Sequence, residues 1–236
     1  MSAFSLGVTN VMTETRLPKR IHESLWVWLF LGSMVILCFF GSSDAQEITE
    51  QGQRLAKLLD SVDVEHLWLA HQYVDWRTGR PKDKPVSDSK PHTHCSAFVA
   101  AAAAKLNIYI LRPPEHSAAM LANPQADWLL RQGKENGWRA VGTAEEAQRL
   151  ANRGILVVAV YKEPALERSG HIAIVRPHEN SPKRIQEEGP QVTQAGMENY
   201  TSTSLKEGFR HHKRAWERGE VQFFSHEVDW RIMAKE

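Results

Sequence analysis

The chain has 236 residues, 42% of them hydrophobic, and is therefore long enough to form one domain with a sizeable core. It carries 29 Lys and Arg against 28 Asp and Glu, for a formal net charge of +1, and both signs are spread along the sequence. Proteins that bind nucleic acid usually carry a basic patch, so this balance predicts no nucleic-acid partner.

The N-terminal 45 residues predict export. Basic residues within 16–20 precede an apolar run over 25–41, and small residues follow at Ser43 and Ala45. This order is typical of a secretory signal peptide cleaved before Gln46. The run is also near the lower limit of roughly 17 residues for a membrane span, so a retained inner-membrane anchor is the alternative. Either way, the remaining chain is expected to be periplasmic or secreted and to meet the membrane only through this segment.

One domain is expected over residues 46–228, with a loosely held C-terminal tail at 229–236. Helical patterns come first, at 48–59, 95–106, 124–135 and 143–151. Short strand-like runs dominate afterwards, at 155–161, 171–175, 190–195 and 221–225. The run at 67–76 is ambiguous between helix and strand. Helices followed by an antiparallel sheet predict an α+β fold class.

Two local signals set helix ends within this pattern. Thr143 with Glu146 is a capping-box pair that marks a helix start, and Gly154 is a natural helix stop. His211 and His212 stand beside two basic residues, a pattern typical of a solvated helix face.

Cys95 is a candidate nucleophile. The other cysteine, Cys38, lies inside the N-terminal apolar run, so removal of that run leaves Cys95 without a disulfide partner. A polar turn at 91–94 leads into Cys95, and the alanines at 100–104 favour a helix. A helix N-terminus favours a thiolate, and an unpaired cysteine in an exported protein suggests a reactive thiol. A buried, inert cysteine on an Ala-rich helix is the alternative.

A thiol nucleophile needs a base, and the base needs an orienting group. His171 opens a strand-like run and could supply the base if the Cys95 helix packs on that strand. On the following run, Gln194 can accept a hydrogen bond from the imidazole N–H through its amide oxygen. Thr193, on the opposite face of the same strand, is the alternative orienting residue. His92 and His94 beside the cysteine could instead bind zinc, but no further ligands complete a set at a recognisable spacing. No metal and no cofactor are therefore predicted.

Four segments follow one another in a characteristic order: a cysteine–serine helix start at 94–99, a Gly-Ile-Leu-Val-Val run at 154–158, Gly-His-Ile-Ala-Ile-Val at 170–175, and a polar strand at 192–195. In order and spacing they resemble the NlpC-type and CHAP-type cysteine peptidases and amidases, which cut peptide bonds in bacterial cell walls. The sequence departs from that pattern at Ile155 and His94, where the families usually have Asp. Neither position is the nucleophile or the base.

The resemblance implies a papain-like (NlpC-type) domain with N-terminal helices packed on an antiparallel sheet. It implies Cys95 as nucleophile, His171 as base, and Gln194 or Asn199 as the third residue. Tyr73 would help to line the oxyanion site, with a core aromatic as the alternative. The implied activity is hydrolysis of amide bonds in peptidoglycan peptides, which would be the substrate and partner. A non-catalytic exported binding module on the same fold and a Cys–His acyltransferase remain alternatives, and the oligomeric state is open.

Overall fold

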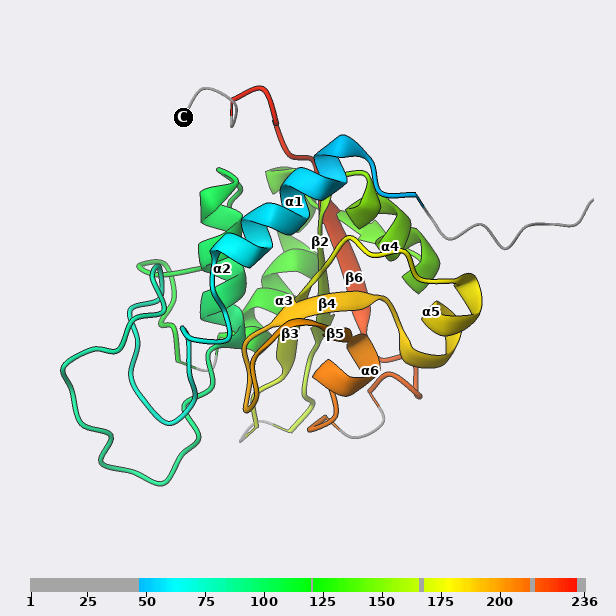
Figure 1. The fold of residues 1–236 in the computed structure, drawn as a ribbon. Helices are drawn as coiled ribbons and strands as arrows, with labels where there is room; N and C mark the ends of the chain where they lie inside the picture. Colours follow the sequence, from blue (N-terminus) through cyan, green and yellow to red (C-terminus); the bar gives the residue numbers. More distant parts are fainter. Residues whose placement is uncertain (1–46, 120, 166–167, 213–214, 233–236) are drawn as a thin grey trace, which may run out of the picture. The chain divides into compact units, whose positions relative to one another are not determined.

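The structure is a computed structural model that describes residues 47–119, 121–165, 168–212 and 215–232 (Figure 1). The predicted signal peptide or anchor at 1–45, together with Cys38, lies outside the described residues. The described chain belongs to one compact unit. None of its helices is long and apolar enough to cross a membrane.

The described residues contain six α-helices, one 3-10 helix and six strands. The helices are α1 (Glu50–Ser61), α2 (Cys95–Lys105), α3 (Ala122–Arg131), η1 (Gly133–Asn136), α4 (Ala144–Asn152), α5 (Pro182–Glu188) and α6 (Leu205–Gly208). The strands are β1 (Arg139–Val141), β2 (Leu156–Tyr161), β3 (His171–Val175), β4 (Gln191–Gln194), β5 (Tyr200–Ser204) and β6 (Gln222–His226).

The strands form a single sheet in the order β1-β6-β2-β3-β4-β5, and every neighbouring pair is antiparallel. The α+β prediction is therefore confirmed. The expectation that the helices all precede the sheet is wrong, because β1 lies between α3 and α4 in sequence, and α5 and α6 alternate with the last strands.

Successive side chains of the central strands point to opposite faces of the sheet, which creates two cores. Ile172 and Ile174 of β3 join the core formed with α1, α2 and α3. Ala173 and Val175 join the second core, formed with α4, α5 and α6. Figure 1 shows α2 and α3 on one side of the strands and α4, α5 and α6 on the other.

The predicted helix signals act as expected. The Thr143 side chain accepts a hydrogen bond of 3.1 Å from the Glu146 N–H at the start of α4. Gly154 follows that helix with a φ of +79°, a conformation that glycine adopts without steric cost. A Cβ on Gly154 would also lie 2.5 Å from the Gln51 side chain.

The C-terminal segment is held more firmly than predicted. The Trp230 indole N–H donates to the Gly154 carbonyl at 2.9 Å. The Arg54 guanidinium lies 4.8 Å from the Trp230 ring centroid and donates to its carbonyl. An aromatic ring that buries its edge and satisfies its N–H anchors the chain locally. The prediction of a loose tail is therefore wrong at residue 230, whereas 233–236 lie outside the described residues.

Candidate functional site

Cys95 is the first residue of α2, where the sequence predicted a helix start, and its side chain is buried. The thiol lies against the backbone N–H groups of Ile172 and Ser96, which favour a thiolate. Burial nevertheless raises the pKa of the Cys95 thiol, and its effect exceeds the opposing effect of the N–H groups. The expectation that the helix start lowers this pKa is therefore wrong. The helix holds the sulfur beside backbone N–H groups, but it also buries the sulfur away from water.

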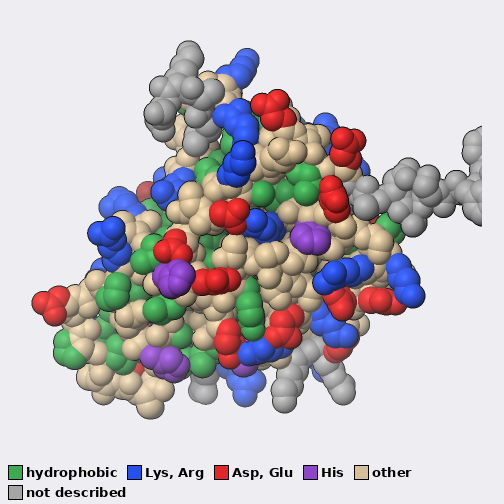
Figure 2. Space-filling view, viewed as in Figure 1, with side chains coloured by type: hydrophobic (Ala, Val, Ile, Leu, Met, Phe, Trp, Pro, Cys, Tyr) green, Lys and Arg blue, Asp and Glu red, His purple; other side chains and the backbone are tan. Residues whose placement is uncertain are grey.

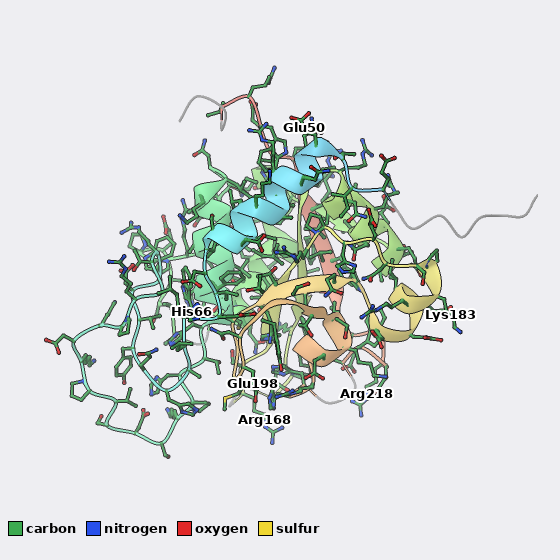
Figure 3. All side chains as sticks on the ribbon, in the orientation of Figure 1. Glu50, His66, Arg168, Lys183, Glu198 and Arg218 are labelled. Atoms are coloured by element: carbon green, nitrogen blue, oxygen red, sulfur yellow. The ribbon has the colours of Figure 1, made fainter. Side chains whose placement is uncertain are left out.

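His171 and Gln194 are in direct contact. The ring Nε2 of His171 is hydrogen-bonded to Oε1 of Gln194, and both side chains are buried. The Gln194 amide nitrogen donates to the Glu198 carbonyl at 2.9 Å, which fixes the amide with its oxygen toward the ring. Glu198 lies in the β4–β5 connection (Figure 3). Because Gln194 Oε1 can only accept, Nε2 of His171 carries the proton, and Nδ1 keeps the lone pair that a base needs.

The His171 ring is neutral at physiological pH. Burial is the main cause of a pKa lowered to about 3, and the nearby His212 adds to it, whereas the bond to Gln194 opposes the shift. The candidate site therefore holds a neutral thiol and a neutral imidazole, rather than a preformed thiolate–imidazolium pair.

Cys95 and His171 meet through the backbone of β3 rather than through their side chains. The thiol contacts the N–H of Ile172, the residue that follows His171. The His171 ring packs on the α6 side, against Phe209 (ring centroids 4.6 Å apart) and His212 (5.4 Å). Among the described residues, no hydrogen bond joins the thiol to the ring.

Asn199, the other candidate for the third site residue, is fully used elsewhere. Its amide nitrogen donates to the carbonyls of Val64 and Leu67 at 2.7 and 2.8 Å, and its oxygen accepts from the Gly196 N–H at 2.9 Å. Asn199 thus ties the β4–β5 connection to the loop after α1. The structure puts Gln194, and not Asn199, against the His171 ring.

Tyr73 lies in the long loop that leads to α2. Its ring packs edge-on against His92, with centroids 4.7 Å apart, and the Lys84 ammonium lies 4.7 Å above its face. Its hydroxyl takes part in none of the hydrogen bonds found in the described parts of the chain. Among the contacts of the described residues, none links Tyr73 to the thiol, and its oxyanion role stays a prediction.

His212 is a site residue that sequence reasoning missed. The prediction of a solvated helix face holds for His211, which is exposed and paired with Glu198, but it is wrong for His212. The His212 ring stacks on His171 with an interplanar angle of 19°. Adjacent histidines give no signal of which one turns inward, because that depends on where the turn after α6 meets the sheet.

The zinc interpretation finds no support in the side-chain contacts. His92 Nε2 is bonded to Asp88, and His94 Nε2 to the Gln72 carbonyl at 2.8 Å. Within the described ranges, no group of three or more His, Cys, Asp or Glu side chains is arranged to hold a metal ion.

The chain matches no protein-family model, and a search of curated proteins finds no similar sequence. The functional assignment therefore rests on the geometry of these residues and on the motifs that surround them.

Proposed function

We propose that this protein is an exported cysteine hydrolase that cuts amide bonds in peptides, with a papain-like arrangement of helix and sheet. Cys95 is the nucleophile, His171 the base, and Gln194 the residue that orients the base. The motif order supports this assignment, as does the packing of α2 on β3. The fold alone does not dictate activity, so the case depends on the site.

One observation carries the proposal: a helix-start thiol lies at the residue next to a histidine whose tautomer is fixed. The Cys95 sulfur contacts the Ile172 N–H. His171 donates through Nε2 to Gln194 Oε1, which leaves Nδ1 as the free basic nitrogen. Nucleophile, base and orienting group are the three parts that thiol catalysis needs.

The reaction starts from the neutral pair. As the Cys95 sulfur attacks the amide carbonyl, its proton passes to His171 Nδ1, and the carbonyl oxygen becomes an oxyanion. The tetrahedral intermediate collapses, the C–N bond breaks, and the imidazolium returns the proton to the departing amine. Water, deprotonated by His171, then attacks the thioester, and the carboxylic acid and free thiol are released.

The proposal requires the thiol and Nδ1 to come within hydrogen-bond distance when substrate binds. Catalytic hydrogen bonds are often long or absent without substrate and tighten in the bound complex. Without substrate the two side chains lie on opposite faces of the sheet: the thiol touches the β3 backbone from the α2 side, whereas the His171 ring packs against Phe209 on the α6 side. The proposed mechanism therefore requires the ring, or the start of β3, to turn toward α2 when substrate binds.

The substrate class follows from the resemblance together with the export signal: peptides of cell-wall peptidoglycan, in the periplasm or outside the cell. Acidic and basic side chains are interspersed over the face seen in Figure 2. A surface of mixed sign suits a peptide that carries both carboxylates and an amine better than it suits a polyanion.

Mass spectrometry of purified muropeptides after incubation with the mature protein tests the activity and identifies the bond. We expect new fragments from the wild type and none from Cys95→Ala or His171→Ala, with folding checked by circular dichroism. His66→Ala is the matched control, because His66 is 79% exposed and far from β3 in the sequence. Cleavage by Cys95→Ala at the wild-type rate would refute the assignment.

A non-catalytic binding module is a second candidate, favoured by the burial of the thiol and its raised pKa. It predicts that the wild type binds peptidoglycan sacculi in a pull-down without releasing fragments, and that Cys95→Ala binds equally well. Fragment release by the wild type excludes it.

A further inference from the structure

The turn after α6 delivers two aromatic rings to the His171 side chain. The Phe209 N–H bonds to the Leu205 carbonyl and the His212 N–H to the Phe209 carbonyl, so the chain keeps turning beyond the helix. Phe209 meets the His171 ring edge-on, with a 77° angle between planes, whereas His212 lies nearly parallel to it. Phe209 and His212 therefore form one side of the packing that encloses the His171 ring.

His212 also reaches solvent, unlike His171. It lines a pocket of about 350 Å³ together with Lys206, Glu207, Phe209, Arg210, Trp216 and Glu217. Its ring takes part in none of the hydrogen bonds found in the described parts of the chain. A partly exposed ring that has no hydrogen-bond partner among the described residues and borders a pocket can exchange protons with the bulk, whereas the buried His171 cannot do so directly.

We infer that His212 is a positioning residue for His171: its stacked ring holds the base, and a positive charge on it opposes protonation of the base. The catalytic part of this inference rests on the proposed function, whereas the coupling between the two rings does not. During the reaction His171 becomes an imidazolium, and a neutral ring beside it tolerates that charge. A protonated His212 would place a like charge 5.4 Å away, measured between ring centroids, and would oppose proton transfer.

Several groups around His212 set when it takes up a proton. Tyr161 packs against the ring at 5.4 Å, and the neighbouring Glu163 carboxylate favours its charged form. Burial has the largest effect and lowers the pKa of His212, Glu163 offsets this only in part, and the adjacent His211 lowers the pKa further. Among the residues that the structure describes, the pocket adds two cations and two carboxylates, from Lys206, Arg210, Glu207 and Glu217. His171 is more deeply buried than His212, and this burial lowers the pKa of His171 to about 3. As the pH falls, His212 therefore takes up a proton before His171 does.

The coupling can be measured by NMR titration of the histidine rings in the wild type, in His212→Phe and in His212→Gln. Both variants remove the charge, and phenylalanine keeps the stacked ring. We expect the pKa of His171 to rise by roughly one unit in both variants, because the charge that opposes its protonation is gone. His66→Phe is the control and should leave it unchanged. An unaltered His171 pKa in His212→Phe and His212→Gln overturns the inference, whether or not the protein is an enzyme.

The pH profile of kcat/KM on the muropeptide substrate tests the catalytic part. In the wild type the loss of activity toward low pH should follow the pKa of His212 measured by NMR. In His212→Phe, which keeps a stacked ring but carries no charge, that loss should follow the pKa of His171 instead. If the loss of kcat/KM toward low pH follows the pKa of the same histidine in the wild type and in His212→Phe, the role of His212 is contradicted. Absence of activity in the wild type refutes the proposed function and leaves the NMR result to decide the coupling.

Discussion

Replacing Gln194 with alanine tests the contact that holds the His171 ring. The change removes the acceptor of the buried Nε2–H and the donor to the Glu198 carbonyl. Each buried polar group left without a partner costs about 1–3 kcal/mol, and His171 is the more deeply buried of the two groups affected. We expect a loss of about 2–4 kcal/mol in the free energy of unfolding, from a total of about 5–15 kcal/mol.

Urea denaturation of Gln194→Ala, His171→Ala and the double variant separates this bond from the other effects of each substitution. Once His171 is gone, Gln194→Ala no longer strands a buried N–H, so it should cost at least about 1 kcal/mol less than it does alone. Gln186→Ala, at an exposed position on α5, is the control and should stay within about 0.5 kcal/mol of the wild type. Additivity of the two site substitutions to within about 0.5 kcal/mol would refute the reasoning.

Three further outcomes follow from the same contacts. Burial raises the pKa of the Cys95 thiol, so iodoacetamide should label it slowly at pH 6 in the folded protein and completely in urea at higher pH; rapid labelling of the folded protein at pH 6 contradicts this. The pKa of His171 is about 3 in the folded protein and near 6.5 in the unfolded chain, so between these pH values the unfolded chain binds one more proton. The free energy of unfolding should therefore fall as the pH is lowered from 6.5 toward 3, by up to roughly 1.4 kcal/mol per pH unit. His171→Gln should flatten the dependence of the urea midpoint on pH, and a slope equal to that of the wild type argues against the burial of His171. Asn199→Ala should cost about 2–4 kcal/mol in urea denaturation, because the carbonyls of Val64 and Leu67 lose their donor, and a loss below about 1 kcal/mol would show that these bonds contribute little.

Much of the fold could be predicted because its signals are local. The Thr143 cap, the Gly154 stop and the alanines after Cys95 each act on neighbouring residues. The structure has α4 between Thr143 and Gly154, and α2 over the alanines. The central strands β2, β3 and β6 could be recognised from their apolar, β-branched and aromatic runs.

Most of the elements that were missed have weaker local signals; α5 is the exception, because Ser181 caps it, Pro182 opens it and Gly189 follows it. β1 has only three residues, two of them exposed, and is defined by its pairing with β6. β5 is a polar strand whose pattern resembles a loop, and α6 has only four residues. The ambiguous run at 67–76 forms neither helix nor strand, because Trp68 has a φ of +52° and its indole bonds to the Trp76 carbonyl.

The candidate site shows the same division. A helix-start cysteine and a strand-start histidine could be inferred from the sequence, and so could a glutamine within reach of the ring. Burial could not be inferred, since the pKa values of Cys95 and His171 depend on what covers them. The contact between His171 and His212 was equally out of reach, because 41 positions separate the two residues in the sequence.

The most direct test of the central claim is the kcat/KM for cleavage of a peptidoglycan peptide by the wild type, Cys95→Ala and His171→Ala, each shown to unfold cooperatively. Because a nucleophile and its base act as a unit, both variants should lose activity by similar factors, on the order of a thousandfold or more. Full activity of folded His171→Ala would contradict the account.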